Sequence, residues 1–399
     1  MKYQNMDEDR LDDEWTTVPS AKSKGRSKPS RETPDWERIE NNRHCWQVIK
    51  NRPHMKYFVN PVFDRILRDD ASRMPYRRRE GTVKTINHWG QRKLLISEIE
   101  FLTLIGRHNL EGAHVVYAGA APGTHIFYLS KLFPEVHFIL VDPAPFHDSY
   151  KKKRWENITI IEECFTDAMA TELAHRCSNI YLISDIRTSN HKVQSDSEVE
   201  RRISQDMACQ MRWHEMLGSK RSMLKFRLPW ESDAPTEYLD GDIYLPVWGP
   251  QTTTECRLIT KADDPRARKM YDNKKYEEQM MFFNNVMRHS LYSHNVEGEG
   301  LDHCYDCTAE IYILKQYLYS KGCSADRIQK EVARMSMEIS RNMMVKRTLL
   351  DDPPDPETRV RNIHNRQHRH GIPEYETDGE VQSWLVSAEA LVQRLDKYS

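Results

Sequence analysis

The chain has 399 residues, of which 38% are hydrophobic and 30% are charged, so it holds less apolar material than a typical globular domain. The 59 Lys and Arg residues against 60 Asp and Glu residues give a formal net charge of −1, which excludes a protein that coats nucleic acid through a uniformly basic surface. The charged N-terminal sequence, the lack of any run of roughly 18 apolar residues and the 8 scattered cysteines lead us to expect a protein of a reduced compartment that is neither exported nor membrane-bound.

The composition changes at two places and predicts one compact domain between two polar segments. Residues 1–44 alternate acidic and basic clusters with Ser, Pro and Gly, and such a segment cannot bury enough apolar surface to offset the entropy of ordering. Residues 346–399 are predicted to form a linker and a C-terminal amphipathic helix. The apolar positions of that helix are Val381, Leu385, Ala388, Val392 and Leu395. The predicted domain spans residues 45–345, and its motifs lie within about 75–320.

Short β-branched runs alternate with helical patterns inside this domain. The predicted strands are residues 114–119, 137–142, 158–163, 181–185, 222–227 and 253–260. The predicted helices lie around residues 92–109, 124–132, 168–176 and 195–217, and the pattern turns helical after about 265. Such alternation is typical of a mostly parallel sheet with helices on both faces, and the first four runs are apolar enough to be buried on both faces. The predicted fold class is therefore α/β, with a doubly wound sheet.

A glycine-containing turn follows the first predicted strand. In VVYAGAAPGTH, Gly119 and Gly123 lie between a buried strand and a helix, where the missing Cβ lets a ligand approach the backbone. The G-x-x-x-G spacing with Pro122 matches neither the dinucleotide fingerprint nor the phosphate-binding P-loop. Asp142 ends the second strand, where a carboxylate can accept hydrogen bonds from both hydroxyls of a ribose. These features favour an adenosyl cofactor; the alternative is a turn whose strand-end Asp caps the next element.

Four charged residues occur in segments that otherwise have an ordered, apolar pattern: Lys93, Asp185, Lys225 and Glu255. Charges inside apolar segments are costly unless they are paired. Asp185 ends a strand and should face the crevice in which doubly wound sheets bind ligands. Partial burial and a second ammonium lower the pKa of a lysine, so Lys225 could take a proton from a sugar hydroxyl. Separate salt bridges are the alternative, because sequence spacing does not bring the four residues together.

No metal site is predicted. Cys304 and Cys307 form one C-x-x-C pair, with Cys323 further along the chain, but a structural zinc normally needs two such pairs. The pair adjoins an apolar helical segment, which favours a role in core packing. The three histidines of the predicted linker are interpreted as solvated side chains.

Together, several segments resemble the poxvirus family of cap-specific mRNA 2′-O-methyltransferases, whose members also serve as the small subunit of the viral poly(A) polymerase. The resemblance covers roughly residues 75–320. Its most specific runs keep their order and intervals: GQRKLLISEIEFL (90–102), VVYAGAAPGTHIFYL (115–129), YLISDIR (181–187), SMLKFRLPW (222–230), TECRL (254–258) and YEEQMMFFNN (276–285). The resemblance implies a Rossmann-like fold, S-adenosyl-L-methionine as methyl donor, and a catalytic Lys-Asp-Lys-Glu tetrad on Lys93, Asp185, Lys225 and Glu255.

The implied reaction converts cap-0 to cap-1 RNA by methylating the ribose 2′-hydroxyl of the first nucleotide. The positions that match methyl-donor contacts of the family are Tyr117, Gly119, Ala121, Pro122, Gly123, Asp142, Phe165, Thr166 and Asp185. The family holds a methylated guanine between two aromatic rings, and one of these positions matches Trp230. An acidic cap contact matches Glu277. A second acidic contact falls on Ser232, so the flanking Asp233 is included among the predicted cap-binding residues.

The position of the second stacking ring is left open by the sequence, because similarity fades upstream. Its candidates are Tyr57, Phe58 and Tyr76. RNA would have to be held by local basic clusters at residues 77–79, 151–154 and 261–275, the last with a local charge of +3; solvated charge runs are the alternative. The resemblance implies capped mRNA as a partner, poly(A) polymerase or RNA polymerase subunits as further partners, no membrane, and the host cytoplasm or viral factory of a large DNA virus.

Two other functions fit the same residues. A polymerase accessory or processivity subunit would keep the fold and bind RNA with little catalysis, but a scaffold need not retain four costly charges. A methyltransferase of internal or ribosomal RNA would keep the tetrad but would have no use for a cap sandwich. Trp230 and Glu277 therefore separate it from a cap-specific enzyme.

Overall fold

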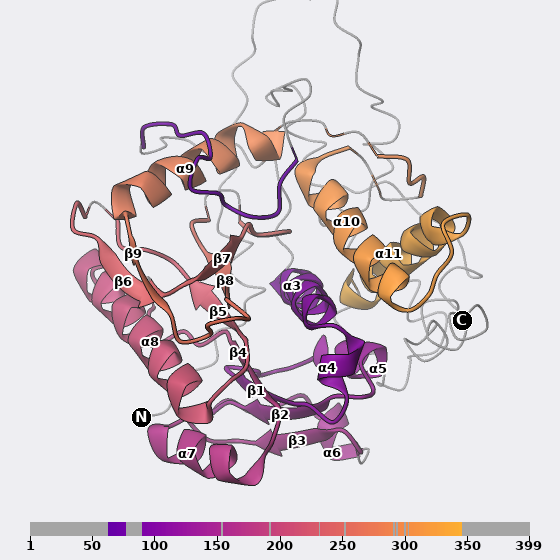
Figure 1. Cartoon of the computed structure of the whole chain (residues 1–399), viewed down its shortest axis with the longest axis horizontal. Helices are drawn as coiled ribbons and strands as arrows, with labels where there is room; N and C mark the ends of the chain where they lie inside the picture. Colours follow the sequence, from indigo (N-terminus) through magenta and orange to yellow (C-terminus); the bar gives the residue numbers. More distant parts are fainter. Residues whose placement is uncertain are drawn as a thin grey trace, which may run out of the picture.

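The computed structural model describes most of the predicted domain. It describes residues 63–76, 90–152, 155–190, 193–230, 232–250, 253–289, 292, 294–298, 301 and 303–344. The predicted N-terminal tail, linker and C-terminal helix lie outside these ranges, and the limits of the domain stay a prediction. The described chain is an α/β structure in which helices flank a seven-stranded sheet (Figure 1). No helix in these ranges is long and apolar enough to cross a membrane.

The seven-stranded sheet has the order β3-β2-β1-β4-β5-β8-β7. Its strands are β1 (His114–Ala118), β2 (His137–Val141), β3 (Ile158–Ile161), β4 (Ile180–Ser184), β5 (Ser222–Phe226), β7 (Gly241–Tyr244) and β8 (Cys256–Thr260). β1 to β5 are parallel, whereas β8 is antiparallel to both of its neighbours. The prediction of a mostly parallel α/β sheet is confirmed, and all six predicted strands are present.

Helices cover both faces of the sheet, with α7 and α8 on one side and α3, α4 and α5 on the other (Figure 1). The helices are α3 (Gly90–Ile105), α4 (Arg107–Leu110), α5 (Ile126–Leu132), α6 (Ser149–Lys152), α7 (Asp167–Arg176), α8 (Asp196–Leu217), α9 (Asn273–Asn285), η3 (Met287–His289), α10 (Tyr305–Ser320) and α11 (Ile328–Met344). α8 begins where the Ser195 hydroxyl accepts a hydrogen bond from the Glu198 amide, and it ends at Gly218, whose φ of 60° is left-handed. These caps fix the helix that packs against β4 and β5.

Three short strands are present that the sequence pattern does not predict. β7 lies at the edge of the large sheet, and β6 (Thr236–Leu239) pairs with β9 (Arg268–Tyr271) in a separate two-stranded sheet. β9 also interrupts the region after residue 265 where a helical pattern is predicted. Each of these strands has four residues and includes exposed or half-buried polar side chains, so none is long enough to show an alternation that periodicity can detect.

A buried charge network joins α10 and α11 to α3. Arg92 Nε of α3 lies 2.7 Å from Glu310 Oε2 of α10, and Arg92 Nη1 lies 2.7 Å from Ser340 Oγ of α11. Trp248 Nε1 donates to the same Glu310 oxygen at 2.7 Å. The side chains of Arg92 and Glu310 are 0% exposed. This network holds α3 in place at Arg92. The residue that follows Arg92, Lys93, belongs to the charged cluster described below.

Removing the Arg92 charge should destabilise the fold far more than removing a surface charge. We expect Arg92→Met to lower the free energy of unfolding by about 3–5 kcal/mol, because Glu310 would stay buried without its counter-charge. The matched control, Arg176→Met, breaks a pair with Glu172 whose side chains are 70% and 62% exposed. That change should cost less than about 1 kcal/mol. Urea unfolding measures both values, and equal losses would contradict a role for the network in holding α3.

Candidate active site

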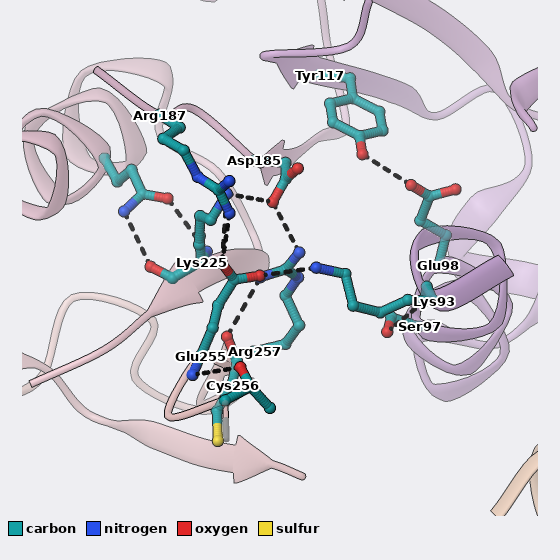
Figure 2. A network of polar contacts seen from close by, with 12 residues as sticks. Lys93, Ser97, Glu98, Tyr117, Asp185, Arg187, Lys225, Glu255, Cys256 and Arg257 are labelled. Atoms are coloured by element: carbon teal, nitrogen blue, oxygen red, sulfur yellow. Dashed lines mark hydrogen bonds and ion pairs between the residues drawn. The ribbon is translucent and has the colours of Figure 1, made fainter. Parts of the chain in front are cut away.

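The four residues of the predicted tetrad converge at the carboxyl ends of the central strands. Asp185 directly follows β4, and Lys225 is next to last in β5. Glu255 directly precedes β8, and because β8 runs antiparallel to β5, its beginning lies at the same edge. Lys93 reaches the cluster from α3 (Figure 2). Four segments far apart in the sequence thus supply one site.

Short contacts join all four side chains. Lys225 Nζ lies 3.0 Å from Asp185 Oδ1 and 3.5 Å from Glu255 Oε2. Lys93 Nζ lies 3.0 Å from Glu255 Oε1. The four side chains are between 13% and 15% exposed. They are therefore shielded from bulk water but still accessible to a small reacting group.

Two arginines complete the cluster, and neither is predicted from the sequence. Arg257 Nη2 lies 2.7 Å from Asp185 Oδ1, and its Nη1 lies 2.9 Å from Glu255 Oε1. Arg187 Nη2 lies 3.2 Å from Glu255 Oε2, and its side chain is 46% exposed. The signal that could have revealed Arg257 is the same as for Lys225, a charge inside an otherwise apolar strand.

The environment of the cluster lowers the pKa of Lys225. Burial lowers the pKa of Lys225, and the positive charge of Arg187 lowers it further, while the neighbouring carboxylates oppose the shift without cancelling it. Burial alone would raise the pKa of Glu255, but the surrounding cations hold it well below its ordinary value. Burial likewise acts to raise the pKa of Asp185, and the charges of Lys225 and Arg257 reverse that effect and lower it. Both carboxylates are therefore ionised acceptors around one ammonium that can become neutral.

The backbone of Lys225 is fixed from both sides. Gln210 of α8 donates from Nε2 to Lys225 O at 3.0 Å, and Lys225 N donates to Gln210 Oε1 at 3.1 Å. On the other side, Lys225 is directly opposite Arg257 in the β5–β8 ladder. Opposed residues share one face of a sheet, so the two cations meet the same carboxylates. The amine is thus placed by the scaffold before any ligand binds.

The predicted ligand turn lies between β1 and α5, against the segment that carries Asp185. Gly119 has a φ of +82°, and a Cβ there would lie 2.8 Å from Ile186 N and 2.9 Å from the carbonyl carbon of Asp185. Gly123 has a φ of +70°, and a Cβ there would lie 2.9 Å from Tyr150 Oη. Glycine is therefore needed at both positions, for conformation and for space.

Asp142 follows β2 and ties that strand to the turn. Its Oδ2 accepts a hydrogen bond from Ala121 N at 3.1 Å, and its Oδ1 accepts one from Ala144 N at 2.8 Å. The peptide bond between Ala121 and Pro122 is cis. Burial raises the pKa of Asp142, and the two amides partly offset this. Each carboxylate oxygen has a further lone pair, so Asp142 can both support the turn and accept hydrogen bonds from ribose hydroxyls.

The other residues predicted to bind the methyl donor have defined contacts of their own. Tyr117 is buried in β1, and its hydroxyl donates to Glu98 Oε1 at 2.8 Å. The buried ring of Phe165 meets Trp213 edge-on, with ring centroids 4.8 Å apart. Thr166 is the N-cap of α7, where its side chain accepts a backbone hydrogen bond. Thr166 therefore stabilises the first turn of α7, directly after Phe165 in the chain.

Trp230 forms an aromatic platform, and its side chain is 44% exposed. The guanidinium of Arg227 covers one face of the indole, 4.2 Å from the ring centroid, and Glu200 of α8 pairs with Arg227. Trp230 Nε1 lies 3.4 Å from Thr254 Oγ1. An indole held from one side can stack a flat base on its other face.

α9 carries a second predicted cap residue, Glu277, directly after a tyrosine that contacts the same residue as Trp230. Tyr276 of α9 donates to Thr254 O at 2.5 Å, and Thr254 is also the residue that Trp230 contacts. Glu277 follows Tyr276 in the chain and is half-buried. The third predicted cap residue, Asp233, is exposed in the loop before β6.

Of the candidates for a second stacking ring, Tyr76 is described and Tyr57 and Phe58 lie outside the described residues. Tyr76 is 47% exposed. It ends a segment that runs along α9, where Met74 N donates to Glu278 O at 3.1 Å. An exposed aromatic residue therefore lies two residues after a backbone contact with α9.

Most cations of the predicted basic run 261–275 are neutralised by acidic residues. The pairs are Lys261 with Asp242 at 2.6 Å, Arg268 with Glu215 at 2.7 Å, and Lys269 and Lys275 with Asp69 at 3.2 and 3.4 Å. This arrangement fits the alternative reading of the run as a salt-bridged surface rather than an open phosphate-binding patch. The run 77–79 lies outside the described residues, as do residues 153 and 154.

The C-x-x-C pair has a structural role at the start of α10. The sulfur of Cys304 accepts a hydrogen bond from Cys307 N at 3.4 Å, and Cys307 is buried. In the described parts of the chain, no group of three or more His, Cys, Asp or Glu side chains could hold a metal ion. Packing and capping therefore account for these cysteines.

Comparison with known proteins places this site in context. A family model described as "Poly A polymerase regulatory subunit" matches residues 61–345, which include the charged cluster and the ligand turn. A relative from Myxoma virus (strain Lausanne), named "Cap-specific mRNA (nucleoside-2'-O-)-methyltransferase", is 26% identical over 258 residues, covering 60% of this chain and 75% of the relative. A protein of the same name from Fowlpox virus (strain NVSL) is 28% identical over 241 residues, covering 57% of this chain and 75% of that protein.

Proposed function

The chain belongs to the family described as poly(A) polymerase regulatory subunit, and we propose that it is an S-adenosylmethionine-dependent, cap-specific mRNA 2′-O-methyltransferase. Relatives from two poxviruses are named for this activity. The observation that carries the proposal is the contact of Lys225 with Asp185 and Glu255, at the strand ends where the turn of Gly119 lies against Asp185. The methyl acceptor is the ribose 2′-hydroxyl of the first nucleotide.

The ligand turn fits the adenosyl part of the methyl donor. Gly119 lets the turn pack closely against the backbone of Asp185 at the end of β1, Asp142 has lone pairs for ribose hydroxyls, and Phe165 offers an apolar ring to a base. When bound, S-adenosylmethionine supplies a methyl group on a positively charged sulfur that is a good leaving group. The protein therefore has to align two substrates and accept one proton.

Lys225 accepts that proton from the ribose hydroxyl. Its lowered pKa leaves a larger neutral fraction near neutral pH than an ordinary lysine has. Asp185 and Glu255 hold Nζ in place, since both contact it. Lys93 and Arg257 hold Glu255 from its other oxygen. Each of these contacts orients the base for proton transfer, which typically accelerates a reaction by about 10²–10⁴-fold.

The cap is recognised by residues other than those that take part in methyl transfer. Trp230 stacks the methylated base on its open face, since a positively charged ring binds well to an indole. Glu277 accepts hydrogen bonds from the guanine N1–H and exocyclic amine, and the exposed Asp233 is a further acidic contact at the rim. Such recognition selects the first nucleotide because the cap is joined directly to it.

Gly119→Ala should weaken binding of the methyl donor. The new Cβ would meet the backbone of Ile186 and Asp185 and would sit at a left-handed φ. We expect donor affinity to fall by about tenfold or more and stability to fall by about 1–3 kcal/mol. The matched control is Gly218→Ala, which has a similar φ of +60° but open space around its Cβ position. Calorimetric titration separates the two, and normal donor binding by Gly119→Ala would rule out the assigned turn.

The proposed function is tested with labelled S-adenosylmethionine and three otherwise identical RNAs. One carries a cap with an unmethylated first ribose, one carries the same cap with that ribose already methylated, and one has no cap. We expect label on the first RNA alone, and competition by free 7-methylguanosine cap analogue. Equal labelling of uncapped RNA would instead support methylation of internal or ribosomal RNA.

A second function is favoured by the family description itself. The name "Poly A polymerase regulatory subunit" suggests that this chain also assists a separate catalytic poly(A) polymerase. Adding the purified chain to such a polymerase should lengthen poly(A) tails, and the Lys225→Met variant should do so equally well if the two functions are separate. As a large DNA virus protein it would act in the host cytoplasm, which fractionation of infected cells would test.

A further inference from the structure

Asp206 of α8 is a buried residue whose carboxyl group holds the segment directly after β4. It is 8% exposed. Its Oδ2 accepts a hydrogen bond from Thr188 N at 2.9 Å, and its Oδ1 accepts one from Thr188 Oγ1 at 2.7 Å. The amide of Thr188 belongs to the planar peptide unit that joins Arg187 to Thr188. Asp206 therefore fixes the backbone at the residue from which the Arg187 side chain reaches the charged cluster.

The segment from Asp185 to Thr188 is held at both of its ends. At its start, Asp185 N donates to Ala118 O of β1 at 3.0 Å. At its end, the contacts with Asp206 tie it to α8. These residues form neither helix nor strand, so their backbone groups depend on partners outside a regular ladder. Between the two fixed ends lies Arg187, whose Nη2 is 3.2 Å from Glu255 Oε2 (Figure 2).

One face of α8 supports both cations that contact this oxygen. Asp206 and Gln210 are four residues apart, so their side chains lie on the same face of the helix. Gln210 binds both backbone groups of Lys225, and Asp206 binds the segment that carries Arg187. The helix therefore sets the positions of the amine and the guanidinium relative to each other.

On the basis of the proposed function, we propose that Asp206 is a positioning residue that acts through Thr188 to hold Arg187 beside the base. The place that it maintains is Glu255 Oε2, which Lys225 also contacts. The positive charge of Arg187 lowers the pKa of Lys225, so displacement of Arg187 leaves the amine more fully protonated.

The direct effect of Asp206 on the amine has the opposite sign. The charge of Lys225 acts to lower the pKa of Asp206, so a negative charge on Asp206 in turn raises the pKa of Lys225. Loss of that charge alone would lower the pKa of Lys225, whereas loss of the Arg187 position would raise it. The direction of the change therefore distinguishes positioning from a direct charge effect.

Other charged groups act on Lys225 or on the carboxylates around it, and they come from three further parts of the site. They are Asp185 after β4, Glu255 and Arg257 at the start of β8, and Lys93 of α3. Arg202 of α8 acts on Asp206 itself. All of these groups are retained in the variants below.

The test is the pH profile of single-turnover methylation of capped RNA by the full chain. An NMR titration of the Lys225 amine, identified by its missing signal in Lys225→Met, follows the same proton without relying on activity. Asp206→Ala removes both contacts with Thr188. We expect the rising limb and the amine titration to move to higher pH, and the rate at neutral pH to fall by about tenfold, since a displaced group can cost up to about 10²-fold.

Three further variants complete the test. Asp206→Asn keeps an acceptor for the Thr188 amide but loses the charge, so its limb should lie at or below the wild-type pH. In an Arg187→Met background, Asp206→Ala should give no further shift to higher pH. The matched control is Asp64→Ala, because Asp64 Oδ1 also holds a backbone amide, that of Ile66 at 3.0 Å, but lies outside the site. It should keep the wild-type limb.

The outcomes separate this inference from the proposed function. A limb that moves to lower pH or stays unchanged in Asp206→Ala overturns the inference, because Asp206 would then act by its charge or on stability alone. An undiminished upward shift in the Arg187→Met background also overturns it. If Asp206→Ala does not fold, as judged by thermal unfolding, Thr188→Val removes the hydroxyl contact, and an unchanged limb in that variant overturns the inference. A wild-type chain that transfers no methyl group overturns the proposed function, and the amine titration then still decides whether Asp206 controls the proton of Lys225.

Discussion

Replacing Lys225 by Met is expected to lower kcat for methyl transfer by about 1,000-fold, within the range of general acid–base catalysis. The methionine side chain fills similar space but cannot accept a proton. Binding of S-adenosylmethionine should change by less than about twofold, because the turn at Gly119 and Asp142 does not depend on the amine. Single-turnover methylation of capped RNA, together with calorimetric titration of the donor, measures both quantities.

The matched control for this variant is Lys321→Met. Lys321 is similarly shielded, at 11% exposure, and pairs with Glu135 at 3.5 Å, but it belongs to the C-terminal end of α10. Its replacement should leave kcat unchanged. Full activity in Lys225→Met would eliminate Lys225 as the base, whereas a loss of kcat matched by a loss of donor binding would assign it to binding instead.

Replacing Arg257 by Met should have the second largest effect, on both stability and pH dependence. Arg257 joins Asp185 to Glu255, so its loss leaves buried carboxylates short of counter-charge and should cost about 3–5 kcal/mol of stability. Its positive charge also lowers the pKa of Lys225. Without that charge the pKa of Lys225 rises, and less neutral amine is present at a given pH.

The pH profile of kcat measures this effect. In wild type the rate should rise with pH as Lys225 loses its proton, and in Arg257→Met the rising limb should move to higher pH. Arg65→Met is the control, because Arg65 forms an equally buried pair with Glu100 outside the site. It should lose comparable stability and keep the wild-type profile. An unshifted limb in Arg257→Met would mean that Arg257 is purely structural.

The central strands could be predicted from the sequence because they are buried on both faces and therefore apolar along their whole length. The runs that begin at His114 and His137 are examples. β7 and β9 could not be predicted, since a four-residue strand at the edge of a sheet or in a two-stranded sheet is specified by its partners rather than by its own pattern. The antiparallel direction of β8 likewise depends on the path of the chain.

The site could be predicted in part for a related reason. Lys225 and Asp185 stand out as charges at the ends of apolar strands, and Gly119 stands out because it follows one. Their mutual distances depend on strand order, which only the fold supplies. The sequence does not distinguish Arg257 and Glu98 from residues of ordinary salt bridges, because their partners come from other strands and helices.

The position of the transferred methyl group tests the proposed chemistry most directly. Capped RNA is incubated with the chain and S-adenosylmethionine, digested with nucleases, and the released cap dinucleotide is analysed by mass spectrometry. A cap-specific 2′-O-methyltransferase with Lys225 as its base predicts one added methyl group on the ribose of the first nucleotide, formed about 1,000-fold more slowly by Lys225→Met. A methyl group on a base or on an internal ribose, or an unchanged rate of product formation by the Lys225 variant, would contradict it.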